Sequence, residues 1–301
     1  MRHVLCSALC ALAAAGAAAQ SPWGTPSFPQ DADKWWWDQA WWESGRMHAP
    51  ANHPVTEHKA SYRSGDVDVP LTIFRPQASG SAKSGADRGF KVVVFLHGRR
   101  GLDEFTRLVP LRLAARGFVV VAPDLFSGRF IEPFPVAHDY ALEEDTARAI
   151  DFALALPDAK GQPKTCVVSH TRGGYYALKA LVTKERQRRI ACYVSYYPHW
   201  QDPNAGEVAQ VYQFAPEVEA LTVPVLVFVG EHEQYQRVRS ILAAINALRA
   251  KGRDARVLVY PGVGRGFDFR ARNVRTFADD LAAQDSLMRA AAFLTRHLSL
   301  Q

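Results

Sequence analysis

The chain is poor in cysteine. Only four occur among 301 residues, and two of them, Cys6 and Cys10, lie in an N-terminal apolar stretch that we expect to be removed. The other two, Cys166 and Cys192, are too few for a fold that depends on disulfide bonds. Both fall in strands expected to be buried, so we expect inert thiols. An oxidising compartment permits a disulfide bond, but neighbouring parallel strands offer poor geometry for one.

Long apolar runs and dense basic clusters are also missing. After the N-terminal stretch, no apolar run is long enough for a membrane-spanning helix. The formal net charge is +6, but the basic residues are scattered and form no nucleic-acid groove. The sequence shows no internal repeat and no linker long enough to divide the main domain. These features exclude nucleic acid as a partner and predict a protein without a transmembrane segment; they do not indicate the oligomeric state.

Residues 1–19 have the pattern of an export signal. Arg2 supplies the charged start, residues 4–15 form a short apolar core, and residues 17–19 are a run of alanine suited to cleavage. We therefore expect cleavage near Ala19 and a mature protein in the periplasm or outside the cell.

Residues 20–56 form a second N-terminal segment, rich in tryptophan and proline. Its tryptophans are Trp23, Trp35, Trp36, Trp37, Trp41 and Trp42. Three interpretations stay open: a segment fixed to the domain by buried indoles, a lid or aromatic wall over a ligand site, and a contact with a membrane interface.

Strand and helix patterns alternate through residues 57–301. The predicted strands cover 57–63, 67–74, 91–96, 118–122, 165–168, 190–197, 224–229 and 256–260, and helical spacing of apolar residues fills most of the intervals. This alternation predicts an α/β fold with a mostly parallel sheet and helices on both faces. Ligand sites on such sheets lie at the carboxyl ends of the strands.

The strand at 165–168 leads into a sharp turn. A nucleophile elbow exposes one side chain between a strand and a helix, and its tight backbone requires small residues two positions before and after the tip. Ser169 and Gly173 occupy those positions, so the tip is Thr171.

Other polar residues also follow strands directly. His97-Gly98-Arg99 follows the strand at 91–96, Gly230-Glu231-His232-Glu233 the strand at 224–229, and Gly262-Val263-Gly264-Arg265 the strand at 256–260. With the elbow, the chain order is oxyanion loop, nucleophile, acid and base position, as in α/β-hydrolases.

These motifs together resemble the dienelactone hydrolase family of α/β-hydrolases. The matching pieces, within about residues 57–298, are Phe95-Leu96-His97-Gly98, Ala122-Pro123-Asp124-Leu125, Arg172-Gly173-Gly174-Tyr175-Tyr176-Ala177, Val229-Gly230-Glu231-His232-Glu233, and Tyr260-Pro261-Gly262 with Gly266-Phe267-Asp268-Phe269. The resemblance implies hydrolysis of esters or lactones by a Cys or Ser nucleophile, an acid and a His, with no metal or organic cofactor.

Residue by residue, the resemblance implies that Thr171 occupies the position of the nucleophile, Glu233 that of the acid and Arg265 that of the catalytic His. The main-chain N–H groups of Arg99 and Arg172 would form the oxyanion hole, which side-chain changes leave intact. Arg265 is the serious departure, because a guanidinium cannot accept a proton at physiological pH. It would instead form an ion pair with Glu233.

Three histidines near strand ends are candidates for a displaced base: His170, His199 and His232. Taken one at a time, each of these histidines is better explained as an ordinary polar loop residue than as a base. His97 is better explained as a residue that holds its own loop by hydrogen bonds.

Two functions therefore stand side by side: an exported hydrolase of small-molecule esters or lactones with an unusual site, and an inactive descendant that binds a small molecule or a protein partner, with Arg265 clamping a carboxylate. A third interpretation is an exported structural protein that adheres through its Trp-rich segment.

Overall fold

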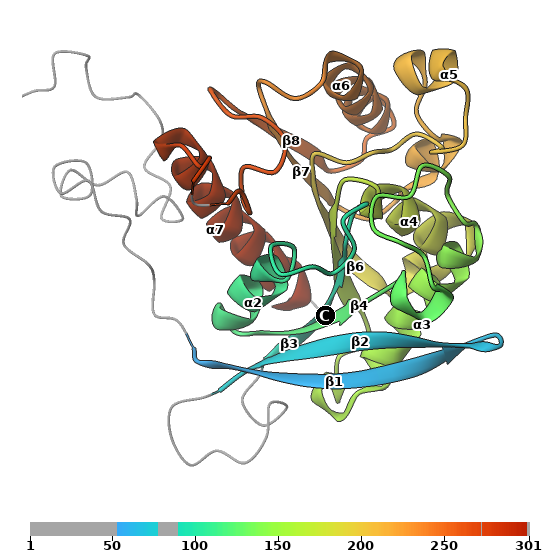
Figure 1. The fold of residues 1–301 in the computed structure, drawn as a ribbon, viewed down its shortest axis with the longest axis vertical. Helices are drawn as coiled ribbons and strands as arrows, with labels where there is room; N and C mark the ends of the chain where they lie inside the picture. Colours follow the sequence, from blue (N-terminus) through green and yellow to red (C-terminus); the bar gives the residue numbers. More distant parts are fainter. Residues whose placement is uncertain (1–52, 78–89, 272, 300–301) are drawn as a thin grey trace, which may run out of the picture.

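The structure, a computed structural model, describes residues 53–77, 90–271 and 273–299. Its centre is an eight-stranded sheet with the order β1-β2-β4-β3-β5-β6-β7-β8 (Figure 1). The strands are β1 (Val55–Ser64), β2 (Val67–Pro76), β3 (Lys91–Leu96), β4 (Phe118–Pro123), β5 (Thr165–His170), β6 (Ile190–Tyr196), β7 (Val225–Gly230) and β8 (Ala255–Tyr260). β1 pairs antiparallel with β2, and β2 with β4, while the other pairs are parallel. The predicted α/β-hydrolase fold is confirmed.

Helices cover both faces of this sheet, as the near-continuous burial of its central strands requires. They are α2 (Leu108–Ala115), α3 (Ala141–Ala155), α4 (Gly173–Leu178), continued by the π-helical turn η5 (Lys179–Thr183), α5 (Glu207–Tyr212), α6 (Tyr235–Ala250) and α7 (Phe277–Ser299); short 3₁₀ turns are η3 (Ser127–Arg129), η4 (Pro157–Ala159), η6 (Arg186–Arg189) and η7 (Pro216–Ala220). Figure 1 shows α2 and α7 on one side of the sheet and α3, α4 and α6 on the other. No helix in the described ranges is both long and apolar enough to cross a membrane.

The N-terminal predictions fall mainly on residues that the structure does not describe. The expected signal peptide, and the tryptophan-rich segment up to residue 52, lie outside the described residues. The description begins at His53, whose N–H donates to the carbonyl of Ala115 at 2.9 Å and whose ring packs on Phe90.

The expectation of two free thiols is wrong. Cys166 of β5 and Cys192 of β6 form a disulfide bond with a Cα–Cα distance of 4.8 Å. The strand register shifts between Thr165 and Cys166, which places Cys166 directly opposite Cys192. Such irregularities re-aim side chains locally, and 4.8 Å lies within the range that a disulfide needs. The sequence does not reveal this shift, so it gave no reason to pair the two residues.

Candidate functional site

The nucleophile elbow is present, with Thr171 at its tip directly after β5. Thr171 has φ +46°, in the left-handed region that a β-branched residue rarely adopts. Its N–H donates to the carbonyl of Tyr196 at 3.2 Å, and its carbonyl accepts from the N–H of Gly174 at 2.9 Å. The small residue at position 173 is required, because a Cβ on Gly173 would lie 2.6 Å from the carbonyl oxygen of Leu96. Close approach of the strand ends therefore explains the small residues of the motif.

The hydroxyl of Thr171 lies against the loop after β3. A Cβ on Gly98 would come within 1.8 Å of the Thr171 Oγ1. Among the described residues, nothing hydrogen-bonds to this hydroxyl, and no carbonyl accepts from the main-chain N–H of Arg99 or Arg172. Within the described part of the chain, the tip therefore has free donors beside it, as an oxyanion hole requires, but no group positioned to remove its proton.

This close packing predicts strong coupling between Gly98 and Thr171. We expect Gly98→Ala to lower the free energy of unfolding by about 2 kcal/mol, the usual scale of overpacking in a close-packed region. Adding Thr171→Ala removes the closest atom, so the double variant should recover more than half of that loss. Urea denaturation of the four proteins of this double-mutant cycle measures the coupling. Strictly additive losses would show that the two residues do not share this space.

Glu233 and Arg265 meet, as the resemblance implies. Glu233 follows β7 and its side chain is fully buried; Arg265 follows β8 and its side chain is 35% exposed. The Nε of Arg265 donates to Oε2 of Glu233 at 3.0 Å. Oε1 of Glu233 accepts from the N–H of Gln234 at 2.8 Å. The acid and base positions of a triad are thus occupied by an ion pair.

His170 does not reach the hydroxyl of Thr171. Its Nε2 is 2.8 Å from Oδ2 of Asp268, and the other carboxylate oxygen accepts from the hydroxyl of Tyr197. Its ring is buried among aromatic side chains, including those of Phe95 and Phe269. It therefore takes part in a structural network behind the elbow.

The other histidines differ in position. His199 is buried, and its N–H donates to the carbonyl of Thr171 at 2.8 Å, which places it beside the tip. His232 is exposed on the loop after β7. His97 holds its loop: its Nδ1 is 2.8 Å from the carbonyl of Gly98 and its Nε2 accepts from the N–H of Leu125 at 3.0 Å. This loop-holding role is the one expected for His97.

His199 lies among positive charges. Burial, reinforced by the charges of Arg237, Arg172 and Arg265, lowers the pKa of His199 well below its ordinary value. Its imidazole is therefore neutral at physiological pH. Its Nε2 has no hydrogen-bond partner among the described residues.

The depressed pKa of His199 predicts an acid-sensitive stability. The unfolded chain binds a proton near pH 6.5 and the folded protein does not, so unfolding is favoured as the pH falls below about 6.5. The expected loss is about 1.4 kcal/mol per pH unit until the folded-state pKa is reached, with a constant contribution above that window. We expect His199→Gln to flatten this slope in urea denaturation between pH 7.5 and 5. The exposed His58→Gln is the matched control; an equal slope in both variants would contradict the assignment.

Arg237 is a site residue that the sequence alone did not suggest. It lies in the first turn of α6, and the charge of Glu233, on the loop before that helix, acts on it. Its Nη1 donates to Oε1 of the buried Gln201 at 2.7 Å, and its Nη2 to Oε1 of Gln210 at 3.2 Å. Burial, with the charge of Arg265, lowers the pKa of Arg237 to about 10. Arg237 therefore remains charged at neutral pH.

Comparison with known proteins agrees with this architecture. Two solved structures with a similar fold are a putative dienelactone hydrolase from Klebsiella pneumoniae subsp. pneumoniae (TM-score 0.62, 19% identity, 81% of this chain and 99% of that one) and a dienelactone hydrolase-like promiscuous phosphotriesterase from metagenomic libraries (0.60, 18%, 81% and 98%). A third is brefeldin A esterase, a bacterial homologue of human hormone-sensitive lipase (0.63, 20%, 85% and 81%). At these identities the likeness establishes the fold. No curated protein gave a significant sequence match.

The family model is more specific than the structural likeness. The model of the dienelactone hydrolase family matches residues 81–298, more than two thirds of the chain, and spans the elbow, Glu233 and Arg265. This chain belongs to the dienelactone hydrolase family.

Proposed function

We propose that this protein binds the carboxylate of a small organic acid where hydrolytic relatives cleave an ester, and that it does not turn esters over. One observation carries the proposal: Nε of Arg237 and Nη2 of Arg265 are buried nitrogens without an acceptor among the described residues. Buried donors are nearly always paired, and guanidinium donors match the geometry of a carboxylate. An anion from solution would supply the missing acceptor.

The charges around His199 support the same conclusion. Three guanidinium groups, those of Arg172, Arg237 and Arg265, act on this imidazole, while Glu233 is the carboxylate that pairs with one of them. These three arginines and Glu233 together carry a net charge of +2, and His199 adds none because it is neutral. A surplus of positive charge in a partly buried site favours anions over neutral esters.

The tip of the elbow supports binding without turnover. Thr171 has a hydroxyl but no base in contact with it among the described residues, and Arg265 in the His place cannot accept its proton. A protonated hydroxyl can still donate to a carboxylate oxygen, as can the N–H groups of Arg99 and Arg172.

Hydrolysis of an ester or lactone is the second candidate, and the position of His199 favours it. Its main-chain N–H donates to the carbonyl of Thr171, and its lowered pKa keeps the ring neutral, the form in which an imidazole has a free acceptor nitrogen. A shift of the ring toward Oγ1 of Thr171 would give a displaced base.

Two measurements separate these functions. Calorimetric titration with benzoate should show binding that weakens about 10- to 100-fold in Arg237→Met, the scale for losing a charge-assisted hydrogen bond. Arg239→Met, on the exposed side of the same helix, should bind as the unmodified protein does. Hydrolysis of p-nitrophenyl acetate should be at background and unchanged by Thr171→Ala. A rate that Thr171→Ala abolishes would establish the second candidate and overturn the first.

We also propose that the mature chain acts outside the cytoplasm. The export pattern of residues 1–19 and the disulfide bond of Cys166 and Cys192 both fit an oxidising compartment. Mass spectrometry of the exported protein should find Gln20 as its first residue; an intact N-terminus in the cytoplasmic fraction would contradict this.

A further inference from the structure

A loop at the border of the candidate site exposes apolar side chains. We call residues 130–138, between η3 and α3, the rim loop. Phe130 is 94% exposed, Val136 85% and Phe134 54%. Single exposed apolar residues are common on protein surfaces, but a cluster on one short loop marks a binding surface more often.

The rim loop is held by the side chains of Arg99 and Arg172, the two residues whose main-chain N–H groups are the candidate oxyanion donors. The guanidinium of Arg99 donates to the carbonyls of Phe134 at 2.7 Å and Pro135 at 3.0 Å. The guanidinium of Arg172 donates to the carbonyls of residues 135, 136 and 137 at 3.0, 3.3 and 3.4 Å. In return, the N–H of Phe134 donates to the carbonyl of Arg99 at 2.6 Å. The loop is therefore fixed directly to the segments after β3 and β5.

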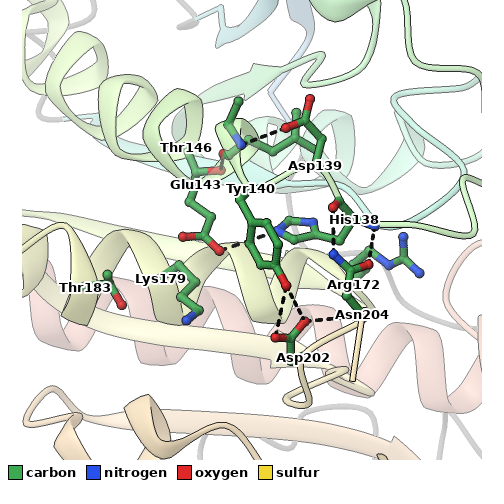
Figure 2. Close-up of polar contacts among 12 residues, drawn as sticks. His138, Asp139, Tyr140, Glu143, Thr146, Arg172, Lys179, Thr183, Asp202 and Asn204 are labelled. Atoms are coloured by element: carbon green, nitrogen blue, oxygen red, sulfur yellow. Dashed lines mark hydrogen bonds and ion pairs between the residues drawn. The ribbon is translucent and has the colours of Figure 1, made fainter. Parts of the chain in front are cut away.

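The other end of the rim loop is fixed to the segment after β6, which carries His199. The side-chain amide of Asn204 accepts from the N–H of His138 at 2.7 Å and donates to its carbonyl at 2.9 Å. The hydroxyl of Tyr140 lies 3.3 Å from the carboxylate of Asp202. Figure 2 shows Asn204 against the backbone of His138 and Asp202 below the ring of Tyr140. Three loops that border the site thus hold the rim loop in place.

The backbone of the rim loop is strained in a way that fits this anchoring. Phe130 has φ +54° and Phe134 has φ +62°. The left-handed region is unfavourable for bulky side chains, and such residues persist where surrounding contacts fix them. The backbone that carries the exposed side chains is therefore held in a fixed conformation.

The geometry points to the rim loop as the apolar wall of the carboxylate site, so that the ligand is a carboxylic acid carrying an alkyl chain or aromatic ring of several carbons. This inference rests on the proposed function. Arg172 connects the rim loop with the carboxylate site. Its guanidinium holds residues 135–137 of the loop, and its charge is one of the three that act on His199. A carboxylate bound among Arg172, Arg237 and Arg265 would extend an apolar portion past Arg172 to Phe134 and Val136.

The test is a calorimetric titration of the purified protein with straight-chain carboxylates from acetate to octanoate. We expect affinity to rise about 2- to 4-fold per added methylene, the range between partial and full burial of each group. In Phe134→Asn/Val136→Ser, acetate should bind as before while the rise with chain length disappears. Asn tolerates the left-handed backbone at position 134, and both side chains are exposed, so these changes leave the core untouched.

The controls separate this inference from the proposed function. Val208→Ser, at a 73% exposed apolar residue of α5, should keep the chain-length dependence. Arg237→Met should weaken every acid by a similar factor. Equal affinity for acetate and octanoate, or a rise that survives in Phe134→Asn/Val136→Ser, overturns the apolar wall and leaves the carboxylate site standing. Failure of every acid to bind overturns both.

Discussion

The variant Thr171→Ser/Arg265→His is expected to hydrolyse p-nitrophenyl acetate about 10²- to 10⁴-fold faster than the unmodified protein, the range that a positioned general base contributes. A carboxylate is already in place beside position 265, because Oε2 of the buried Glu233 accepts from Nε of Arg265 at 3.0 Å. A histidine there would accept the proton of the introduced serine hydroxyl and be oriented by Glu233, as in other triads. The main-chain donors of Arg99 and Arg172 need no change.

Two further variants show whether the gain in hydrolysis comes from a working triad. Thr171→Ser alone supplies a less crowded hydroxyl but no base, so its rate should stay near background. Adding Glu233→Gln to the double variant should remove most of the gain, because the histidine loses its orienting partner. A folded double variant with no gain would mean that other positions also limit activity.

Loss of the disulfide bond is expected to have the largest effect on stability. Cys166 and Cys192 close a loop across a sequence separation of 26 residues. The chain-entropy model gives about 3–4 kcal/mol for a loop of that length at 25 °C. We therefore expect Cys166→Ala/Cys192→Ala to unfold at a clearly lower urea concentration than the unmodified protein, with a somewhat larger m value because its unfolded chain is less compact.

The reducing agent dithiothreitol provides the control. It should lower the urea midpoint of the unmodified protein and leave that of Cys166→Ala/Cys192→Ala unchanged. The unfolded, unreduced protein should also incorporate no iodoacetamide at either position. Labelling of both thiols would show that the bond does not form in the purified protein.

The sequence predicted best those features that depend on local pattern. The elbow at Thr171 was recognisable because Ser169 and Gly173 meet a steric requirement, and the contact of Gly173 with the carbonyl of Leu96 shows why. The ion pair of Glu233 with Arg265 was predictable because both positions follow strands whose ends meet at one edge of the sheet.

Features that depend on register and side-chain direction were not predictable. Cys166 faces Cys192 only because the register shifts by one residue beside it. His170 and Thr171 are neighbours in sequence, yet the ring of His170 contacts Asp268 behind the elbow. Arg237 is placed in the site by hydrogen bonds to Gln201 and Gln210, and no local pattern predicts those contacts.

By itself, the sequence determined an α/β-hydrolase fold, the order of its functional loops and the absence of a histidine at the base position, because strand patterning and steric limits at tight turns are local. Only the tertiary structure decided which groups share the site. It brought two nitrogens of Arg237 and Arg265, which have no acceptor within the part of the chain that the structure describes, beside a neutral His199, and it fixed the apolar rim loop to Arg99 and Arg172. Those contacts join residues far apart in the chain, so they depend on packing between elements that local patterns do not specify.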